Sequence, residues 1–341
     1  MNYIRSKAPL RISLAGGGSD VSPFSDMFGG AILNATISLY ANASIEPTND
    51  GKITFTLADI NKEICFEQAE ELPIDNDFKL HAGIYNRIVK DFAKKSLSFR
   101  LTTSVDAPPG SGLGTSSTLV VAIIGAFAEW LKLPLGEYDL AHLAYEIERI
   151  DLNMAGGKQD QYSATFGGVN FMEFFHDDKV IVNPLRIKDI YLQELANNLI
   201  LYNTQTSRLS AKIIEAQQNN VRDGNQISID AMHKMKQQSL MMKETLLKGN
   251  LDMIGEILNY GWFFKKQMAE EISNQDLENL YETAMKHGAT GGKISGAGGG
   301  GFMLFYCPGN SKFNVAQAIK QYGGQVLRYS FTQKGLETWS V

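Results

Sequence analysis

Cysteine is scarce in this sequence: its 341 residues include only Cys65 and Cys307. Two isolated thiols exclude a disulfide-stabilised scaffold and give no support to a zinc site, which needs several closely spaced ligands. Both cysteines stand beside strand-like apolar residues. We therefore expect two core thiols.

Long apolar runs and excess positive charge are also absent. No stretch approaches the roughly 20 apolar residues of a membrane-spanning helix, and Met1–Lys7 lacks the apolar centre of a signal peptide. The net charge of −5 argues against nucleic acid or an anionic membrane as a partner. We expect a cytoplasmic protein in which local groups hold any anionic ligand. The sequence leaves a homodimer open.

No proline-rich or serine-rich linker interrupts the chain, and no period of 20–50 residues indicates a repeat fold. The length suggests two domains, and 44% hydrophobic with 20% charged residues is typical of a globular protein. The character of the sequence changes near residue 195. We divide the chain into 1–190 and 191–341 and expect the two halves to pack together.

Hydrophobic periodicity predicts both strands and helices. Strands are expected at 10–14, 31–46, 53–57, 64–66, 97–105, 168–174, 199–202, 302–306 and 325–331. Helices are expected at about 78–92, from 119 onward, and at 137–152, 209–219, 228–247, 251–270 and 312–322.

The clearest motif is Pro108–Thr118, in which three alternating glycines precede four consecutive hydroxyl residues. It follows a predicted strand and opens a predicted apolar helix. Free N–H groups and the helix dipole at such a place bind anions, phosphate above all. A tight turn before a buried helix is the plainer alternative, since Ser and Thr are also favoured at helix N-caps.

A second glycine-rich stretch spans 291–301. Gly296–Gly301 matches G-x-G-x-x-G, but an apolar strand follows where the dinucleotide fingerprint needs a helix. Gly292 and Lys293 are followed by Ile294 rather than Ser or Thr, so the P-loop is excluded too. The His-Arg-Asp and Asp-Phe-Gly motifs of protein kinases are missing.

Three stretches together resemble the motifs of the GHMP kinases, the superfamily of galactokinase, homoserine kinase, mevalonate kinase and phosphomevalonate kinase. Ala8–Gly16 resembles the first motif. Pro108–Ser116 resembles the second, Pro-x-x-x-Gly-Leu-Gly-Ser-Ser, with Thr115 in place of the first Ser. Lys293–Gly300 resembles the third. Their order and spacing agree over nearly the whole chain.

The resemblance implies an α+β fold with an N-terminal domain of the ribosomal S5 domain-2 type and a ferredoxin-like C-terminal domain. The active site would lie between them, with ATP as the phosphoryl donor and Mg²⁺ as the cofactor. The expected ATP-binding residues are Pro109, Gly110, Ser111, Gly112, Leu113, Gly114, Thr115, Ser116 and Ser117.

The same resemblance implies the catalytic roles. The family holds Mg²⁺ with one hydroxyl and one Glu, which we align with Ser116 and Glu148; Glu146 is the alternative to the latter. Asp160 would be the catalytic base or the carboxylate that orients the acceptor hydroxyl. Arg11 would face Asp160 and keep it ionised. On local sequence alone, these charges could equally lie on the surface.

The acceptor side of the site is expected to use Gly17, Gly18, Ser19, Asp20, Lys158, Arg208, Gly296, Gly298 and Gly299. Asp20 would accept hydrogen bonds from sugar hydroxyls, and the glycine loop near residue 296 would close over the reacting groups. A phosphorylated sugar also needs a cation. The candidates are Lys158, Arg208 and Lys293. Arg208 is the first choice because a guanidinium group can form two parallel hydrogen bonds to a phosphate. A surface position for Arg208 is equally open.

Differences from the general superfamily motifs indicate which branch of the superfamily this sequence resembles. Galactokinase-like members carry Gly-Glu-His-x-Asp where Gly16–Asp20 reads Gly-Gly-Gly-Ser-Asp. That segment and Gly157–Tyr162 resemble the branch of bacterial D-glycero-D-manno-heptose 7-phosphate kinases and the kinase part of fucokinases. The resemblance implies a small-molecule kinase that phosphorylates the anomeric hydroxyl of the heptose phosphate to give the 1,7-bisphosphate, for nucleotide-activated heptose and cell-surface polysaccharide synthesis.

Three other functions stay open on this fold. The acceptor could be fucose or another free sugar. An ATP-dependent decarboxylase of the mevalonate type would share the glycine loops. A catalytically silent nucleotide and sugar sensor is the alternative of a different class, but a sensor needs neither a base such as Asp160 nor the metal ligands Ser116 and Glu148.

Overall fold

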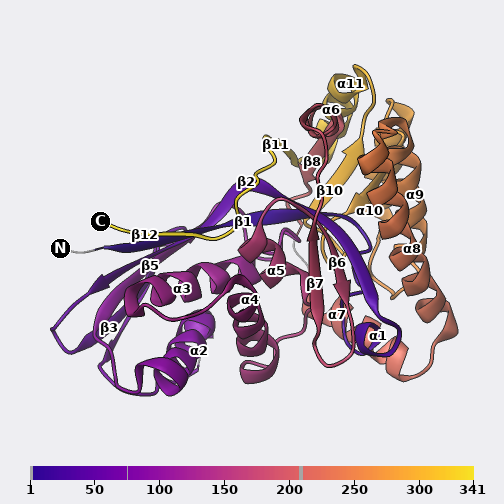
Figure 1. Ribbon diagram of the computed structural model, residues 1–341. Helices are drawn as coiled ribbons and strands as arrows, with labels where there is room; N and C mark the ends of the chain where they lie inside the picture. The colour runs from indigo at the N-terminus through magenta and orange to yellow at the C-terminus, as the bar shows by residue number, and fades with distance from the viewer. Residues whose placement is uncertain (1–2, 75, 207–209) are drawn as a thin grey trace.

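Two β-sheets organise the fold of the computed structural model, which describes residues 3–74, 76–206 and 210–341 (Figure 1). Over these residues one sheet has eight strands and the other has four. The larger sheet belongs mainly to the first half of the chain and the smaller sheet to the second half.

The larger sheet is built on two long neighbouring strands, β1 (Ile4–Ala15) and β2 (Gly30–Pro47). The first half of β2 pairs with β6 and its second half pairs with β5, so β2 joins two parts of the sheet. The strand order is β12 (Glu337–Ser340), β1, β2, β5 (Phe99–Val105), β3 (Lys52–Leu57) and β4 (Lys62–Glu67), with β6 (Val169–Phe174) and β7 (Val180–Pro184) continuing from β2.

Helices cover one face of this sheet, below it in Figure 1. They are α2 (Lys79–Ile88), α3 (Thr115–Leu131), α4 (Glu137–Glu146) and α5 (Gln159–Phe166). Helix α3 is apolar around most of its circumference and lies at the centre of this layer, as expected for a buried helix. Its burial holds the glycine loop that precedes it at a defined place on the sheet.

The smaller sheet has the order β11 (Gln325–Leu327), β8 (Leu199–Asn203), β10 (Phe302–Tyr306) and β9 (Gly291–Ile294). Helix α6 (Asp189–Asn198) crosses the boundary between the halves, and the helices after it are α7 (Ser210–Arg222), α8 (Gln226–Lys248), α9 (Ile254–Lys265), α10 (Gln275–Lys286) and α11 (Ser311–Ile319). A short helix α1 (Phe24–Phe28) lies before β2.

The two halves share one hydrophobic core. Ile12 and Leu33 of the larger sheet lie in the same buried cluster as Leu201 and Leu304 of the smaller one. The expected packing of the halves against each other is therefore confirmed. We keep residues 1–190 and 191–341 as the proposed domains, and β12 from the end of the chain adds a strand beside β1 in the first sheet.

Some sequence-based predictions were wrong in detail. The final segment predicted as a strand, 325–331, is a strand only over β11, and β12 was not expected. Cys307 is buried as predicted, but Cys65 is exposed. Cys65 lies in the edge strand β4, where alternate side chains face opposite sides, and its neighbours Ile64 and Phe66 take the side that packs on the core.

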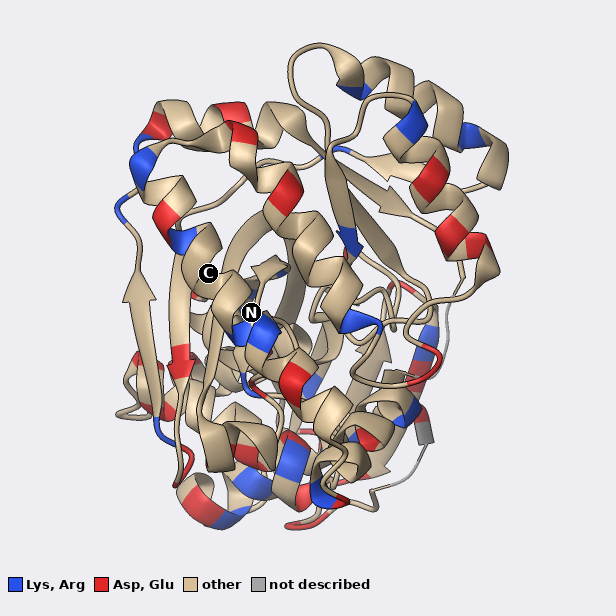
Figure 2. Cartoon of the chain, turned by 90° about the vertical axis from the view of Figure 1, so that its right-hand side faces the viewer, with Lys and Arg blue, Asp and Glu red and all other residues tan. Residues whose placement is uncertain are grey.

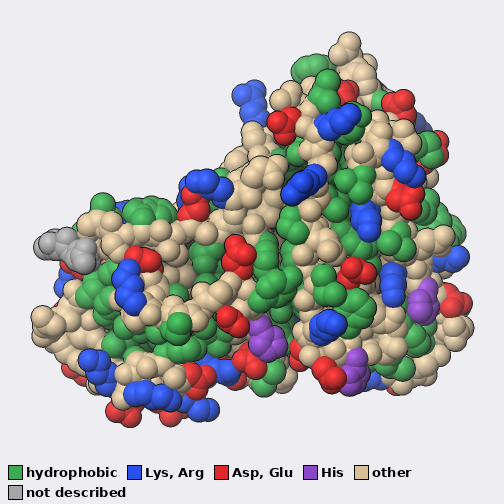
Figure 3. Space-filling view, viewed as in Figure 1, with side chains coloured by type: hydrophobic (Ala, Val, Ile, Leu, Met, Phe, Trp, Pro, Cys, Tyr) green, Lys and Arg blue, Asp and Glu red, His purple; other side chains and the backbone are tan. Residues whose placement is uncertain are grey.

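Charges of both signs are mixed over the surface. Figure 3 shows basic and acidic side chains interspersed with apolar ones on one face, and Figure 2 shows both signs along the helices of the second half. Among the described residues, no helix has the length and apolar character needed to span a bilayer.

Candidate active site

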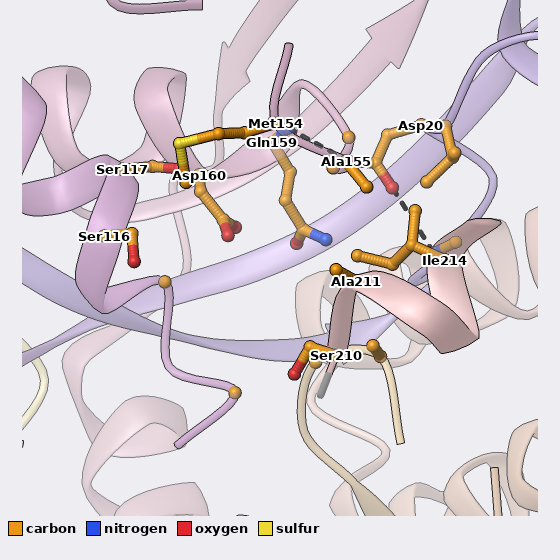
Figure 4. Close-up of a pocket in the computed structure, with 18 of the residues that line it drawn as sticks. Asp20, Ser116, Ser117, Met154, Ala155, Gln159, Asp160, Ser210, Ala211 and Ile214 are labelled. Atoms are coloured by element: carbon orange, nitrogen blue, oxygen red, sulfur yellow. Dashed lines mark hydrogen bonds between the residues drawn. The ribbon is translucent and has the colours of Figure 1, made fainter. Parts of the chain in front are cut away.

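A cavity of about 290 Å³ lies where the three glycine-containing motifs meet (Figure 4). Its wall combines residues from both halves of the chain, which explains why no single segment of sequence outlines it. The predicted site residues that line it are Arg11, Gly18, Asp20, Gly110, Gly112, Gly114, Thr115, Ser116, Ser117, Glu148, Asp160 and Gly296.

The first glycine-rich loop places the N-terminus of α3 at this cavity. Gly114 is the N-cap residue of α3, with a φ of 79° that favours glycine, and no side chain of the described residues caps the helix. The amide of Thr118 bonds the carbonyl oxygen of Gly114 at 2.9 Å, so the amides of Thr115, Ser116 and Ser117 precede the first full helical turn. This arrangement can bind phosphate oxygens.

Part of the predicted ATP loop turns away from the cavity. Pro109, Ser111 and Leu113 do not line it. Leu113 is fully buried, and its carbonyl oxygen accepts a hydrogen bond from the amide of Arg11 at 3.2 Å. Ser111 is buried as well, whereas Pro109 is exposed at the surface.

The two glycine-rich loops cross each other at Gly112 and Gly296. A Cβ atom on Gly112 would lie 2.2 Å from the carbonyl oxygen of Ser295, and one on Gly296 would lie 2.6 Å from the Cα of Gly112. The Ser295 hydroxyl donates to the Gly112 carbonyl oxygen at 2.8 Å. The glycines therefore permit a backbone approach that larger residues would block.

Two further glycines of the second glycine-rich loop, Gly298 and Gly299, lie away from the cavity. Gly298 and Gly299 pack against Ile272, whose carbonyl oxygen accepts from the Gly299 amide at 2.9 Å. Neither lines the cavity, whereas Gly296 and Ala297 do.

Arg11 and Asp160 form an ion pair at the junction of the loops. Nε of Arg11 donates to Oδ1 of Asp160 at 2.7 Å, and Nη2 lies 2.6 Å from the same oxygen. Nη1 donates to the Gly112 carbonyl oxygen at 2.6 Å. The Arg11 side chain is 3% exposed and that of Asp160 is 21% exposed, so the carboxylate is the partner that a ligand can reach.

Asp20 anchors the start of α5, the helix that carries Asp160. Oδ2 of Asp20 accepts hydrogen bonds from the amides of Lys158 and Gln159 at 2.9 and 3.1 Å, and Oδ1 accepts from the Gly18 amide at 3.3 Å. Burial raises the pKa of Asp20; the Gln159 amide opposes this shift, and the Asp160 charge adds to it. Asp20 lines the cavity, but its hydrogen bonds mainly position α5 (Figure 4).

Glu148 fits a metal ligand. It lies in a π-helical turn, η3 (Ile147–Asp151), a deformation often found at functional sites. It is fully buried, and its Oε2 accepts from Nε2 of Gln161 at 2.5 Å. Among the described residues its Oε1 has no hydrogen-bond partner, and a buried bare carboxylate oxygen is costly unless a cation occupies it. Glu148 and Ser116 supply the oxygen atoms that Mg²⁺ prefers.

Other predicted residues lie outside the cavity lining. The Lys158 ammonium is 3.1 Å from Asp26 and 2.7 Å from Asp178, and it lies over the Tyr145 ring. Its charge is therefore already paired. Arg208 lies outside the described residues.

Ser19, Gly17 and Lys293 are internal to the fold. The Ser19 hydroxyl donates to the Gly16 carbonyl oxygen at 2.8 Å. Burial lowers the pKa of Lys293 well below its usual value, and its Nζ donates to the Ser13 carbonyl oxygen at 2.7 Å. Gly17 offers its carbonyl oxygen to Nζ of Lys265 at 3.3 Å.

Two cationic residues of the cavity were not predicted. Arg149 follows Glu148, and its Nη2 is 3.4 Å from the hydroxyl of Ser117, a residue of the predicted ATP loop. The helical pattern gave no reason to choose it, since neighbouring residues on a regular helix face different directions. Lys265 ends α9, far in sequence from every motif.

An open helix N-terminus, an accessible carboxylate and a buried metal-ligand candidate are the groups that phosphoryl transfer requires. Residues 80–168 match the GHMP kinases N terminal domain, and residues 242–325 match the GHMP kinases C terminal family. The chain belongs to the GHMP kinases, and it is a phosphotransferase that uses ATP. The expected α+β fold of this family is confirmed.

Two heptose kinases are similar to this chain over nearly their whole length, and a plant fucokinase is similar to it over part of its own length. The chain is 48% identical over 341 residues to D-glycero-alpha-D-manno-heptose 7-phosphate kinase of Campylobacter jejuni, covering 100% of both chains. A solved D-glycero-D-manno-heptose 1-phosphate kinase from Bacteriodes thetaiotaomicron superposes with a TM-score of 0.85 at 45% identity, covering 98% of each chain. The bifunctional fucokinase/GDP-fucose pyrophosphorylase of Arabidopsis thaliana is 26% identical over 87% of this chain and 29% of its own length.

Proposed function

We propose that this chain is a sugar kinase that transfers the γ-phosphoryl group of ATP to the anomeric hydroxyl of D-glycero-D-manno-heptose 7-phosphate. The product is the 1,7-bisphosphate, a precursor for nucleotide-activated heptose and cell-surface polysaccharide. The observation that carries this proposal is the full-length 48% identity to the Campylobacter jejuni kinase named for this acceptor.

The donor end of the proposed site is the loop at α3. The amides of Thr115, Ser116 and Ser117 and the positive end of the helix dipole hold the ATP phosphates. Arg149 adds positive charge beside Ser117. Fixed donors of this kind need little reorganisation as charge shifts from the γ-phosphoryl group to ADP.

The acceptor end is the Asp160–Arg11 pair. Asp160 takes the proton of the sugar hydroxyl as its oxygen bonds to the γ-phosphorus, and the bond from that phosphorus to the bridging oxygen of ADP breaks. Arg11 stabilises the ionised carboxylate and holds it against the phosphate loop through the Gly112 carbonyl oxygen. Asp20 fixes the helix from which Asp160 projects.

We assign Mg²⁺ to Ser116 and Glu148. This assignment is supported by Oε1 of Glu148, which has no hydrogen-bond partner in the described part of the chain. When bound, Mg²⁺ neutralises charge on the β- and γ-phosphate oxygens of ATP. Gln161 orients Glu148 by donating to its other carboxylate oxygen.

Replacing Glu148 by Gln should raise the Mg²⁺ concentration needed for half-maximal activity by roughly tenfold or more, because a neutral amide replaces a carboxylate ligand. Titration of activity with Mg²⁺ at saturating ATP measures this effect. Glu146→Gln is the matched control: Glu146 lies two residues earlier but pairs with Arg87 at 2.5 Å, outside the cavity. Equal Mg²⁺ requirements in both variants would remove Glu148 from the metal site.

An acceptor screen tests the proposed substrate directly. The two heptose kinases above are named for a 7-phosphate and a 1-phosphate acceptor, and either acceptor would give the same bisphosphate. The purified protein should therefore be incubated with ATP and Mg²⁺ and with each heptose phosphate separately, and phosphorus NMR should follow the new ester. Rapid turnover of the 7-phosphate is expected, and preference for the 1-phosphate would overturn the proposed site of phosphorylation.

Fucose is the second candidate acceptor, because the chain also resembles a fucokinase over 87% of its length. The same screen should include fucose, galactose and mevalonate. Faster turnover of a free sugar would replace the heptose assignment. Release of carbon dioxide from a mevalonate derivative would identify a decarboxylase, and ATP binding without turnover of any acceptor would indicate a sensor.

A further inference from the structure

Lys265 is a buried cation that the proposed mechanism does not use. It is 1% exposed at the end of α9 and lines the cavity. Its ammonium has three N–H donors, and the one hydrogen bond found for it in the described structure, to the Gly17 carbonyl oxygen, is long at 3.3 Å. A desolvated ammonium with so few acceptors has capacity for a ligand.

An independent donor lies beside the same turn. Gln217 of α7 is 1% exposed and lines the cavity, and within the described residues its Nε2 has no hydrogen-bond partner. Its side-chain amide lies against Gly18, since a Cβ on that glycine would be 3.5 Å from Oε1 of Gln217. Lys265 contacts the preceding residue, Gly17. Two helices thus bring unused N–H donors to one end of the cavity.

The surrounding charges leave this end suited to an anion. Burial lowers the pKa of Lys265 to about 8; the Asp20 carboxylate opposes that shift, and the Arg11 charge adds to it. Lys293 also lies near Lys265. Asp20 already accepts three amide hydrogen bonds, and Asp160 is paired with Arg11. A phosphate dianion, which only accepts hydrogen bonds, complements these donors better than a hydroxyl, which must also donate.

We propose that Lys265 and Gln217 bind the phosphate group that the sugar acceptor already carries. This inference rests on the proposed function, since it requires a sugar phosphate as the acceptor. The pairing of Lys158 with Asp26 and Asp178 leaves that lysine without a free charge for the same task. Lys265 and Gln217 would then distinguish phosphorylated from free sugars.

The first test compares two acceptors in each variant. Lys265→Met and Gln217→Met should raise the KM for heptose 7-phosphate, the former by about 10- to 100-fold because a charge-assisted contact is lost. The KM for ATP should stay within about twofold of wild type, and so should the KM for unphosphorylated heptose, which has no phosphate to lose. Lys266→Met is the matched control, since Lys266 pairs with Glu278 outside the cavity.

The pH dependence gives a signature that a structural role would not produce. Above about pH 8 the wild-type ammonium loses its proton in the free protein, so the KM for heptose 7-phosphate should rise with pH. The phosphate itself, with a second pKa near about 6, stays a dianion over that range. In Lys265→Met the KM should be high and flat from pH 7 to 9.

Titration calorimetry with heptose 7-phosphate in the absence of ATP separates this inference from the proposed function. Weaker binding to Lys265→Met supports the phosphate site even if wild type shows no turnover, in which case only the proposed reaction fails. Normal binding and a normal KM in both variants would overturn the site. If the variants lost the same affinity for phosphorylated heptose as for free heptose, the proposal would also be overturned, because the two side chains would then contact a hydroxyl group. If Lys265→Met does not fold, Gln217→Met decides between these results.

Discussion

Replacing Asp160 by Asn should lower the rate of the chemical step by about 10²- to 10⁴-fold, the usual contribution of a positioned base. The amide cannot take the hydroxyl proton, although it has nearly the same shape. Because Asp160 lies at the acceptor end, ATP affinity should change little. A single-turnover measurement with excess enzyme isolates this step from product release.

The loss of the Asp160 charge also affects the fold, since Arg11 would keep a buried guanidinium without its carboxylate partner. A thermal melt must therefore show that Asp160→Asn is folded at the assay temperature. Asp189→Asn serves as the control, because Asp189 occupies the first turn of α6 as Asp160 occupies that of α5, but outside the cavity. A normal chemical rate in folded Asp160→Asn would remove Asp160 from the reaction.

Replacing Gly112 by Ala should lower both stability and ATP affinity. The methyl group would lie 2.2 Å from the Ser295 carbonyl oxygen, so the two glycine-rich loops must separate. The φ of 79° adds about 1–2 kcal/mol of strain for a residue with a side chain. We expect a lower Tm and an ATP KM at least about tenfold higher, because a shift of even one ångström misplaces the phosphate loop.

Gly323→Ala separates strain from steric overlap. Gly323 has the same φ of 79°, but a Cβ there would have no neighbour within 4 Å. Its variant should lose only the strain energy and keep its ATP affinity. If the two variants lost equal amounts of thermal stability and of ATP affinity, the close contact between the two loops would not be needed for ATP binding.

The glycine loops were predictable because their conformation depends on nearby residues. Pro108–Thr118 contains both the glycines that allow positive φ and the start of the helix that provides free amides. Their local character made the motifs recognisable, and the family matches confirm that the chain belongs to the GHMP kinases. The individual roles of Asp160, Arg11, Ser116 and Glu148 stay predictions, supported by their positions around one cavity.

Lysines were the least predictable part of the site. Lys158 stands two residues before Asp160, yet its ammonium group forms ion pairs with Asp26 and Asp178, which lie on other segments. Lys265 stands next to Lys266 in an ordinary helix, and local sequence does not distinguish them. The packing of α9 against the turn at Gly17 buries Lys265 and leaves Lys266 partly exposed.

The sequence alone therefore specified the family and the position of its glycine-rich motifs, because these depend on short segments with local conformational requirements. The tertiary structure decided which charges remain available to ligands. That outcome depends on burial and on ion pairs between residues far apart in the chain, such as Arg11 with Asp160 and Lys158 with Asp178. The strength of a charge–ligand contact follows from its surroundings, and the fold alone creates those surroundings.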